Sequence, residues 1–324
     1  MKVEFELKPQ RLQGIIPAIA LPMGMDAKPD LETLESYLDW LLSFRLGGLA
    51  INADTGEGPH LHRHEKVLVL RKVAEVVGGR LPIIAGLNAR FTEEAIEEAK
   101  DAKKAGADAV LVFPIPAFTS SPLPPEIPYE YHRAIWEEVG IPIVLFQLQP
   151  SLGGVLYEPE TLRRLCGIEG IIALKEASFD ALRYLQALRI IRSLERPISI
   201  LTGNDNFIFE SFLLGCDGGL LGLSNVGIDL QVEMFEALQK GDIQKALALR
   251  ERVQILADAI FAPPVVDYRA RIKEALFIMG IFKNAMVRPP LRPLEDLERA
   301  RIKEALKKAG VLRVQREKEK EKEK

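Results

Sequence analysis

The sequence predicts an α/β fold, a (β/α)8 barrel or TIM barrel followed by a C-terminal helical extension. Short apolar runs alternate with helical patterns along most of the 324 residues, and the runs are rich in Ile, Val and Leu. Runs of this composition are typical of parallel strands that are buried on both faces. The pattern repeats eight times, and the predicted strands are residues 14–22, 48–54, 82–88, 109–114, 142–148, 170–177, 198–205 and 219–225.

Helical segments separate these strands, with apolar residues at steps of three and four. The clearest are residues 31–44, 65–77, 93–105, 159–165, 181–193 and 207–214. Asp30 and Thr92 are predicted N-caps, and Pro159 is a predicted first-turn proline.

Eight strand–helix repeats favour a barrel, because each crossover covers the sheet and the eighth strand can close on the first. An open doubly wound sheet is the alternative. Its first turn would usually read G-x-G-x-x-G, whereas residues 22–26 read Pro-Met-Gly-Met-Asp.

The sequence pattern divides the chain into four predicted parts. They are an N-terminal segment (1–13), the barrel (14–240), the helical extension (241–312) and a charged tail (313–324) that is expected to be solvated or disordered. The extension carries helical patterns at residues 243–259, 269–279 and 294–308, and the proline-rich segment 288–293 is expected to run extended before the last of them.

Composition argues against several classes of protein. The formal net charge is −3, which gives no reason to expect a nucleic-acid partner. No apolar run approaches the roughly 18 residues of a membrane span, and the first residues lack a signal-peptide core, so a cytoplasmic protein is expected. Cys166 and Cys216 lack C-x-x-C spacing and are expected to be buried, reduced thiols.

The residue that breaks the strand pattern is Lys175. It follows the apolar run 171–174, where a lysine must reach solvent, pair with an acid such as Glu176, or exist partly as the neutral amine. A neutral amine is a nucleophile toward carbonyl carbon. Taken alone, this stretch favours a salt bridge of Lys175. A nucleophilic role for Lys175 therefore depends on the residues at the other strand ends.

Polar residues also end several other predicted strands, and in a barrel the carboxyl ends of all strands gather at one face. The turn after the second strand, Asp54-Thr-Gly-Glu-Gly58, has small residues that let backbone N–H groups converge on a carboxylate. An ordinary capped turn is the alternative. Beside Lys175, the turn suggests a 2-keto acid site, in which the amine attacks the ketone and the resulting iminium lets C3 lose a proton or break a bond.

With these residues the chain resembles the dihydrodipicolinate synthase / N-acetylneuraminate lyase family of Schiff-base-forming, pyruvate-handling barrels. The matching segments lie between about residues 14 and 312: Thr55-Gly-Glu57, Leu61 with Glu65, Pro82-Ile-Ile-Ala-Gly86, Ile172-Ala-Leu-Lys-Glu-Ala177, Leu201-Thr-Gly-Asn-Asp205, Gly218-Gly-Leu-Leu-Gly222 with Asn225, and Arg288-Pro-Pro-Leu-Arg-Pro293. The resemblance implies a homotetrameric enzyme in which Lys175 forms the imine and Thr55 and the Gly56 backbone bind the carboxylate. The other strand-end residues expected to contact substrate are Gln147, Asp205 and Ser224.

The chain departs from the family's pattern at positions that matter for the reaction. Asp54 stands where the family has a second hydroxyl residue, and Phe146 stands where it has a proton-carrying tyrosine. Phenylalanine cannot transfer a proton, so Asp54 is the first candidate for that role, with Thr55 and Gln147 as helpers. Residues 151–154 offer no arginine for the carboxylate of an aldehyde substrate, and residues 114–118 lack the family's tyrosines.

These departures predict a changed substrate. We expect an aldolase or dehydratase that acts on pyruvate or a 2-keto-3-deoxy sugar acid, without a ranking between the two reactions. Condensation of the dihydrodipicolinate synthase type and a keto-acid sensor with weak turnover are the alternatives. No cofactor or metal is expected, because imine chemistry needs none and His60, His62 and His64 do not share a helical face. A phosphorylated substrate stays open, because the glycine-rich segment 215–222 is compatible with a phosphate cradle or with close packing.

Overall fold

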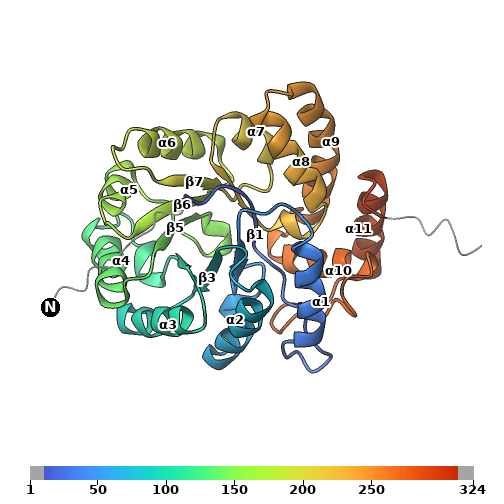
Figure 1. The fold of residues 1–324 in the computed structure, drawn as a ribbon, viewed down its shortest axis with the longest axis horizontal. Helices are drawn as coiled ribbons and strands as arrows, with labels where there is room; N and C mark the ends of the chain where they lie inside the picture. The colour runs from blue at the N-terminus through green and yellow to red at the C-terminus, as the bar shows by residue number, and fades with distance from the viewer. Residues whose placement is uncertain (1–10, 313–324) are drawn as a thin grey trace, which may run out of the picture.

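The computed structural model describes residues 11–312, which form a barrel of strands surrounded by helices (Figure 1). The prediction for the charged tail 313–324 and most of that for segment 1–13 lie outside the described residues.

Eight parallel strands form one sheet in the order β1-β8-β7-β6-β5-β4-β3-β2. They are β1 (Gly14–Pro17), β2 (Leu49–Ile51), β3 (Ile83–Leu87), β4 (Ala109–Val112), β5 (Ile143–Leu148), β6 (Ile171–Ala177), β7 (Ser199–Thr202) and β8 (Gly218–Leu221). A parallel bridge between Ala18 and Ala50, with a hydrogen bond of 3.0 Å from the Ile19 N–H to the Ala50 carbonyl, joins the two ends of the sheet. The predicted barrel is confirmed, and the open sheet is excluded because β1 pairs with β8 on one side while this bridge joins the end of β1 to β2 on the other.

A helix follows each strand and covers the outside of the barrel (Figure 1). These helices are α1 (Leu31–Leu41), α2 (Arg63–Val77), α3 (Thr92–Lys104), α4 (Glu126–Val139), α5 (Pro159–Cys166), α6 (Ala181–Arg192), α7 (Ile208–Leu213) and α8 (Ile228–Gln239). The predicted cap at Asp30 is confirmed, since its carboxylate accepts from the Thr33 N–H at 3.0 Å. The predicted cap at Thr92 is wrong: Phe91 is the N-cap and Thr92 is already the first helical residue.

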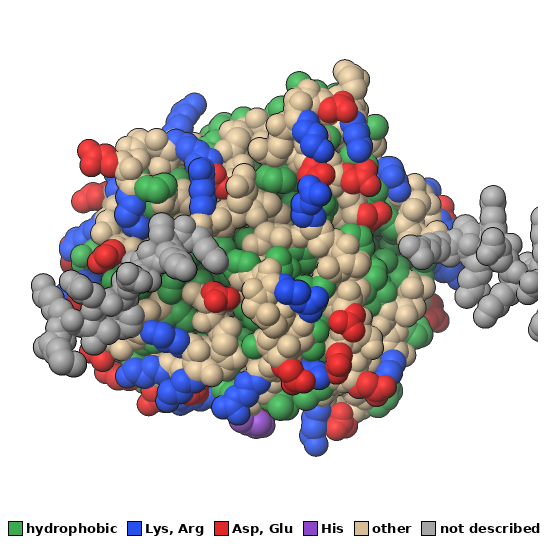
Figure 2. Space-filling model, in the orientation of Figure 1, with side chains coloured by type: hydrophobic (Ala, Val, Ile, Leu, Met, Phe, Trp, Pro, Cys, Tyr) green, Lys and Arg blue, Asp and Glu red, His purple; other side chains and the backbone are tan. Residues whose placement is uncertain are grey.

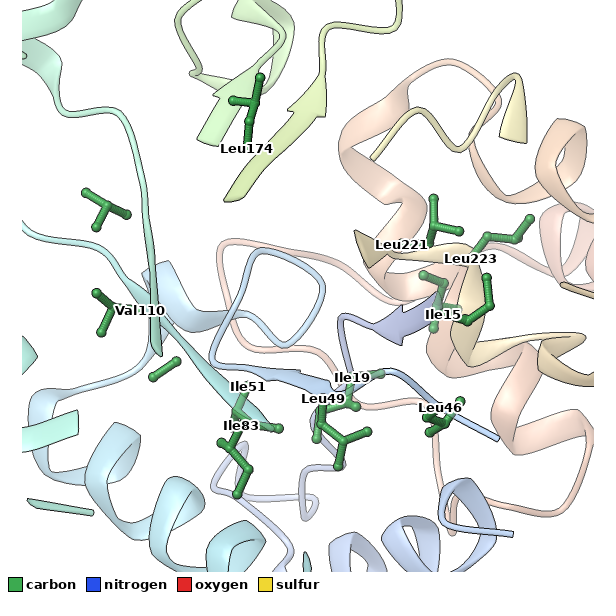
Figure 3. Close-up of a cluster of buried hydrophobic side chains, with 14 of the residues drawn as sticks. Ile15, Ile19, Leu46, Leu49, Ile51, Ile83, Val110, Leu174, Leu221 and Leu223 are labelled. Atoms are coloured by element: carbon green, nitrogen blue, oxygen red, sulfur yellow. The ribbon is translucent and has the colours of Figure 1, made fainter. Parts of the chain in front are cut away.

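Alternate strand residues face opposite sides of the barrel wall, as the period of two in a strand requires. Ile16, Ile84 and Leu201 pack together inside the barrel. Ile15 and Ile83 point outward and pack in the larger cluster beneath the helices (Figure 3). Parallel strands read as continuous apolar runs because both of their faces are buried in this way.

The C-terminal helices α9 (Ile243–Ile260), α10 (Tyr268–Ile278) and α11 (Asp296–Lys308) follow the last barrel helix without a further strand. Figure 1 shows α9 beside α8, and α10 between α1 and α11. Every residue of α10 from Tyr268 to Leu276 is buried, including four that carry charge. The extension is therefore packed into the barrel rather than set apart from it.

Figure 2 shows Lys, Arg, Asp and Glu side chains interspersed over the visible face, without a patch of one sign. Among residues 11–312, no helix is long and apolar enough to cross a membrane. Cys166 and Cys216 are buried and free, which confirms their prediction as unpaired thiols.

Candidate active site

A cavity lies at the carboxyl ends of the strands, where a barrel places its functional residues. It holds about 340 Å³ of empty space, counting the part that is open to solvent. Five residues singled out from the sequence lie on its wall: Asp54, Thr55, Phe146, Lys175 and Asp205. Phe261 and Tyr268, which no sequence motif indicated, complete the wall from the C-terminal extension.

Lys175 points into the barrel from β6 and is 7% exposed. Its Nζ lies 4.2 Å from the centroid of the Phe146 ring, its partner on β5. A Cβ atom on Gly203 would lie 2.9 Å from Lys175 Cε, so the bare backbone of Gly203 makes room for the lysine. Burial lowers the pKa of Lys175 to about 8, although the charges of Asp205 and Asp54 favour the ammonium form. About a tenth of the amine is therefore neutral at pH 7.

Glu176 lies on the opposite face of β6 from Lys175. Its carboxylate accepts hydrogen bonds from Asn204 Nδ2 at 2.6 Å, from the Ser178 N–H at 3.1 Å and from Gln147 Nε2 at 3.2 Å. The suggestion of a Lys175–Glu176 salt bridge is therefore wrong, and Lys175 keeps its amine inside the cavity.

Of the two acids whose charge raises the pKa of Lys175, Asp205 has the larger effect. It is 5% exposed and accepts a hydrogen bond of 2.8 Å from the Leu223 N–H. Burial raises the pKa of Asp205 to about 7, while this hydrogen bond and the Lys175 cation act in the opposite direction. Asp205 and Lys175 thus both exchange protons close to neutral pH.

The turn after β2 is held in an unusual backbone conformation. Asn52 and Glu57, neither of them glycine, have positive φ values of 55° and 56°. Backbone strain of this kind is concentrated at functional sites. Within the described residues, the N–H groups of Thr55 and Gly56 make no hydrogen bond. They are thus free to donate hydrogen bonds. Thr55 lines the cavity and Gly56 does not, so carboxylate binding by this turn stays a prediction.

Two residues of the C-terminal extension, Lys273 and Arg288, bind this turn and the helix that follows it. Glu57 is fully buried and forms an ion pair with Lys273 of α10. Its other oxygen accepts the Arg288 N–H at 2.8 Å, and the Arg288 guanidinium binds Glu65 at the start of α2. Arg288 holds the pKa of Glu65 down, to about 2, through these hydrogen bonds. The turn is therefore anchored by buried charges.

Asp54 does not face the cavity as an isolated carboxylate. One oxygen forms an ion pair with Arg269, whose Nε also donates to the Asp54 carbonyl at 3.0 Å. The other oxygen accepts a hydrogen bond of 2.6 Å from Tyr268 Oη. The Arg269 cation offsets the repulsion that Asp54 would exert on a substrate carboxylate. No sequence motif indicated Arg269, because its partner Asp54 is 215 residues away in the chain.

Two predicted substrate-binding residues do not reach the cavity. The Gln147 side chain accepts from the Tyr157 N–H at 3.1 Å and donates to Glu176, on the outer side of β5. The Ser224 hydroxyl donates to Gln231 Oε1 at 2.7 Å and is fully buried. Both side chains lie behind the cavity wall and are absent from its lining, so this geometry does not favour direct contact with substrate.

Apolar and aromatic side chains form the outer part of the wall. Phe179 has a φ of 59° and packs edge-on against Phe261, with 6.0 Å between the ring centroids. Leu148 and Leu152 complete this side. Apart from Lys175, no cationic residue lines the cavity in the described part of the chain.

The histidines that follow the turn do not form a metal centre. The rings of His62 and His64 stack with 5.6 Å between their centroids, and His62 is the N-cap of α2. Among residues 11–312, no group of three or more His, Cys, Asp or Glu side chains is placed to hold a metal ion.

The chain is a TIM barrel with its cavity at the carboxyl ends of the strands. TIM-barrel enzymes have their active sites at this face. The chain belongs to the dihydrodipicolinate synthetase family, whose sequence pattern matches residues 11–309. This confirms the resemblance found in the motifs.

Curated relatives and solved structures agree with this assignment. The chain is 32% identical over 295 residues to the 4-hydroxy-tetrahydrodipicolinate synthase of Archaeoglobus fulgidus, covering 91% of this chain and 97% of the relative. It is 30% identical over 300 residues to the enzyme of the same name from Gluconacetobacter diazotrophicus, covering 93% and 98%. The dihydrodipicolinate synthase of Acinetobacter baumannii, solved with pyruvate, superposes with a TM-score of 0.82 at 31% identity and covers 93% of this chain and 99% of its own. A monomeric variant of dihydrodipicolinate synthase superposes with a TM-score of 0.85 at 26% identity, covering 94% and 100%.

Proposed function

We propose that this protein is a Schiff-base-forming lyase in which Lys175 attacks the ketone of pyruvate or of a 2-keto-3-deoxy acid. The observation that carries the proposal is a buried lysine, with its pKa lowered to about 8, on the same cavity wall as the Thr55 turn. A buried amine with a lowered pKa is a nucleophile near neutral pH. The family membership supports a pyruvate-handling lyase.

The geometry suggests a role for each group. The Thr55 hydroxyl and the N–H groups of Thr55 and Gly56 hold the carboxylate of the keto acid, which places C2 in front of Lys175. Addition of Nζ to C2 and loss of water give an iminium, and its positive charge lets C3 lose a proton. That loss of the C3 proton belongs to a dehydratase, which then expels the C4 hydroxyl as water. An aldolase instead removes the proton of the C4 hydroxyl and breaks the C3–C4 bond, whose electron pair forms the enamine while C4 leaves as the aldehyde.

The wall of the cavity supports a reaction other than dihydrodipicolinate synthesis. Arg269 is paired with Asp54, and Lys175 is the one cationic residue on the cavity wall among the described residues. A second carboxylate on the aldehyde partner thus finds no cation. Condensation of the synthase type is the second candidate, because relatives at about 30% identity carry that name. Turnover of pyruvate with a carboxylate-bearing aldehyde, compared with cleavage and dehydration of 2-keto-3-deoxy acids, decides between them.

Reductive trapping tests the proposal itself. The protein is mixed with pyruvate, reduced with borohydride and digested, and the peptides are weighed. We expect an adduct on the Lys175 peptide and none in a Lys175→Met variant. An adduct elsewhere, or no adduct, would contradict the enzyme proposal. An adduct on Lys175 without turnover of any keto acid would favour the keto-acid sensor.

A further inference from the structure

The cavity contains one phenol, and it comes from outside the strands. Of the residues on the cavity wall, Tyr268 is the one tyrosine, and it opens helix α10. Phe146, at the strand position where the resemblance leads one to expect a tyrosine, offers only its ring face to Lys175. A proton carrier must therefore come from another element.

The contacts of Tyr268 hold its hydroxyl at a defined place. Tyr268 Oη donates to Asp54 Oδ2 at 2.6 Å, and the Thr55 side chain lies near enough to lower the pKa of the same phenol. The ring stacks on Phe261 with 5.1 Å between centroids and an interplanar angle of 18°. The residue is 4% exposed. The phenol oxygen thus lies beside Thr55, the proposed carboxylate-binding residue.

Gly222 lies between Thr55 and Asp205, the acid whose charge acts on Lys175. A Cβ atom on Gly222 would lie 3.1 Å from Thr55 Oγ1 and 3.5 Å from Asp205 Oδ2. The Thr55 hydroxyl and the Asp205 carboxyl are therefore separated by about the width of one side chain. A small keto acid bound to Thr55 lies within reach of Asp205 and of the Tyr268 phenol.

We propose that Tyr268 is a catalytic acid and base of the imine reaction, with Asp54 as the positioning residue that orients its hydroxyl. This inference rests on the proposed function of Lys175. The Tyr268 phenol gives its proton to the hydroxyl of the carbinolamine, which leaves as water while the C=N bond forms. The phenolate then takes a proton from C3, and the C–H electron pair moves into the enamine. Tyr268 ends as the phenol, so no other reactant is needed.

The surroundings of Tyr268 favour its role as the base that takes the C3 proton. Arg269 pairs with Asp54, so the short-lived phenolate does not face an uncompensated carboxylate. Burial and Asp54 hold the pKa of Tyr268 well above its usual range. The phenol therefore stays protonated before the reaction, and the phenolate is a strong base toward C3.

Exchange of the C3 protons of pyruvate with solvent deuterium, followed by proton NMR, tests this role in the full-length protein. Tyr268→Phe keeps the stacking ring and removes the hydroxyl. We expect it to slow C3 exchange by about 10² or more, while borohydride still traps an adduct on Lys175. The matched control is Tyr131→Phe, which removes another buried phenol, one without a hydrogen-bond partner in the structure. That variant is expected to exchange at the rate of the unaltered protein.

The outcomes separate this inference from the proposed function. Wild-type exchange in Tyr268→Phe, with an adduct on Lys175, overturns the role of Tyr268 and leaves the lyase proposal standing. Absence of any adduct in the unaltered protein overturns the lyase proposal first.

A second measurement covers the case in which Tyr268→Phe does not fold. Fluorotyrosine placed at position 268 by nonsense suppression keeps the shape and makes the phenol more acidic, so its phenolate removes the C3 proton more slowly. Fluorotyrosine at position 131 is the control. Equal exchange rates in the two proteins would overturn the role of Tyr268.

Discussion

Lys175 and Asp205 titrate close together, and this sets an expectation for the effect of pH on imine formation. The amine reacts only when neutral, and its pKa is about 8. The rate of adduct formation with pyruvate should therefore rise about tenfold between pH 6 and pH 7 and level off above pH 8 to 9. Stopped reduction with borohydride at each pH measures it. A rate that falls as pH rises over this range would contradict a neutral-amine nucleophile at Lys175.

Replacing Asp205 with Asn provides the control for the sign of this effect. The Asp205 charge favours the ammonium form of Lys175, so its removal lowers the pKa of the lysine further. The pH profile of Asp205→Asn should move to lower pH. A profile that moves to higher pH would show that Asp205 does not act on Lys175 through its charge.

Gly222 sets the space between the two ends of the cavity. In Gly222→Ala, the new methyl would contact Thr55 Oγ1 at 3.1 Å and Phe261 Cζ at 3.3 Å. Its φ of −71° suits any residue, so little backbone strain is expected. We expect a raised KM for the keto acid with a thermal midpoint within a few degrees of the parent. Gly24→Ala, where the nearest neighbour is the exposed Asp26 side chain, is the control and should leave KM unchanged.

Sequence patterns locate Lys175 but not its surroundings, for a physical reason. A lysine after an apolar strand is visible because it breaks a local pattern, and Thr55 and Asp205 follow from the rule that strand ends meet. Tyr268 is invisible because it acts on Asp54, 214 residues earlier, and the start of a helix carries no local sign of that contact. Gln147 was expected to contact substrate, but its side chain faces away from the cavity. Strand residues alternate, so once Phe146 faces inward its neighbour Gln147 must face outward.

At the scale of elements, α10 is the helix on which the site depends. Lys273 forms a buried ion pair with Glu57, and each side chain is 1% exposed or less. Burial lowers the pKa of Lys273, and Glu57 opposes that shift. Lys273→Met leaves Glu57 as an unpaired buried charge, which should reduce the free energy of unfolding by about 3–5 kcal/mol. Urea denaturation followed by circular dichroism measures the loss.

A double variant and a surface control test the cause of this loss. Glu57→Gln combined with Lys273→Met removes both charges, and the amide can still accept from the Arg288 N–H. It should recover part of the stability. Lys308→Met breaks an exposed pair with Glu304 and should have no measurable effect. A double variant less stable than Lys273→Met would show that packing, rather than an unpaired charge, explains the loss.

At the scale of the whole molecule, the sequence predicts the barrel because it alternates eight apolar strands with helices that can cover them, and the eighth strand can then close on the first. It does not predict how the extension packs, because the helical pattern of α10 shows only that it is a helix. The homotetramer implied by the family resemblance stays a prediction. One of the similar solved structures is described as a monomeric variant of its enzyme. Light scattering of the full-length protein can measure the mass of the assembly.

We expect that a chain cut after residue 240, which keeps the whole predicted barrel segment 14–240, does not form a stable barrel without the extension. Removal of residues 241–324 takes away Arg269, Lys273 and Arg288, which leaves Asp54, Glu57 and Glu65 without their cations. It also uncovers the apolar face of α8 that packs on α9. Each of these carboxylates that stays buried without its cation costs several kcal/mol, and together these costs approach the whole stability of a typical domain. Circular dichroism and limited proteolysis of the truncated and full chains measure this. A truncated protein with cooperative unfolding and protease resistance like the full chain would show that the barrel is a separate domain.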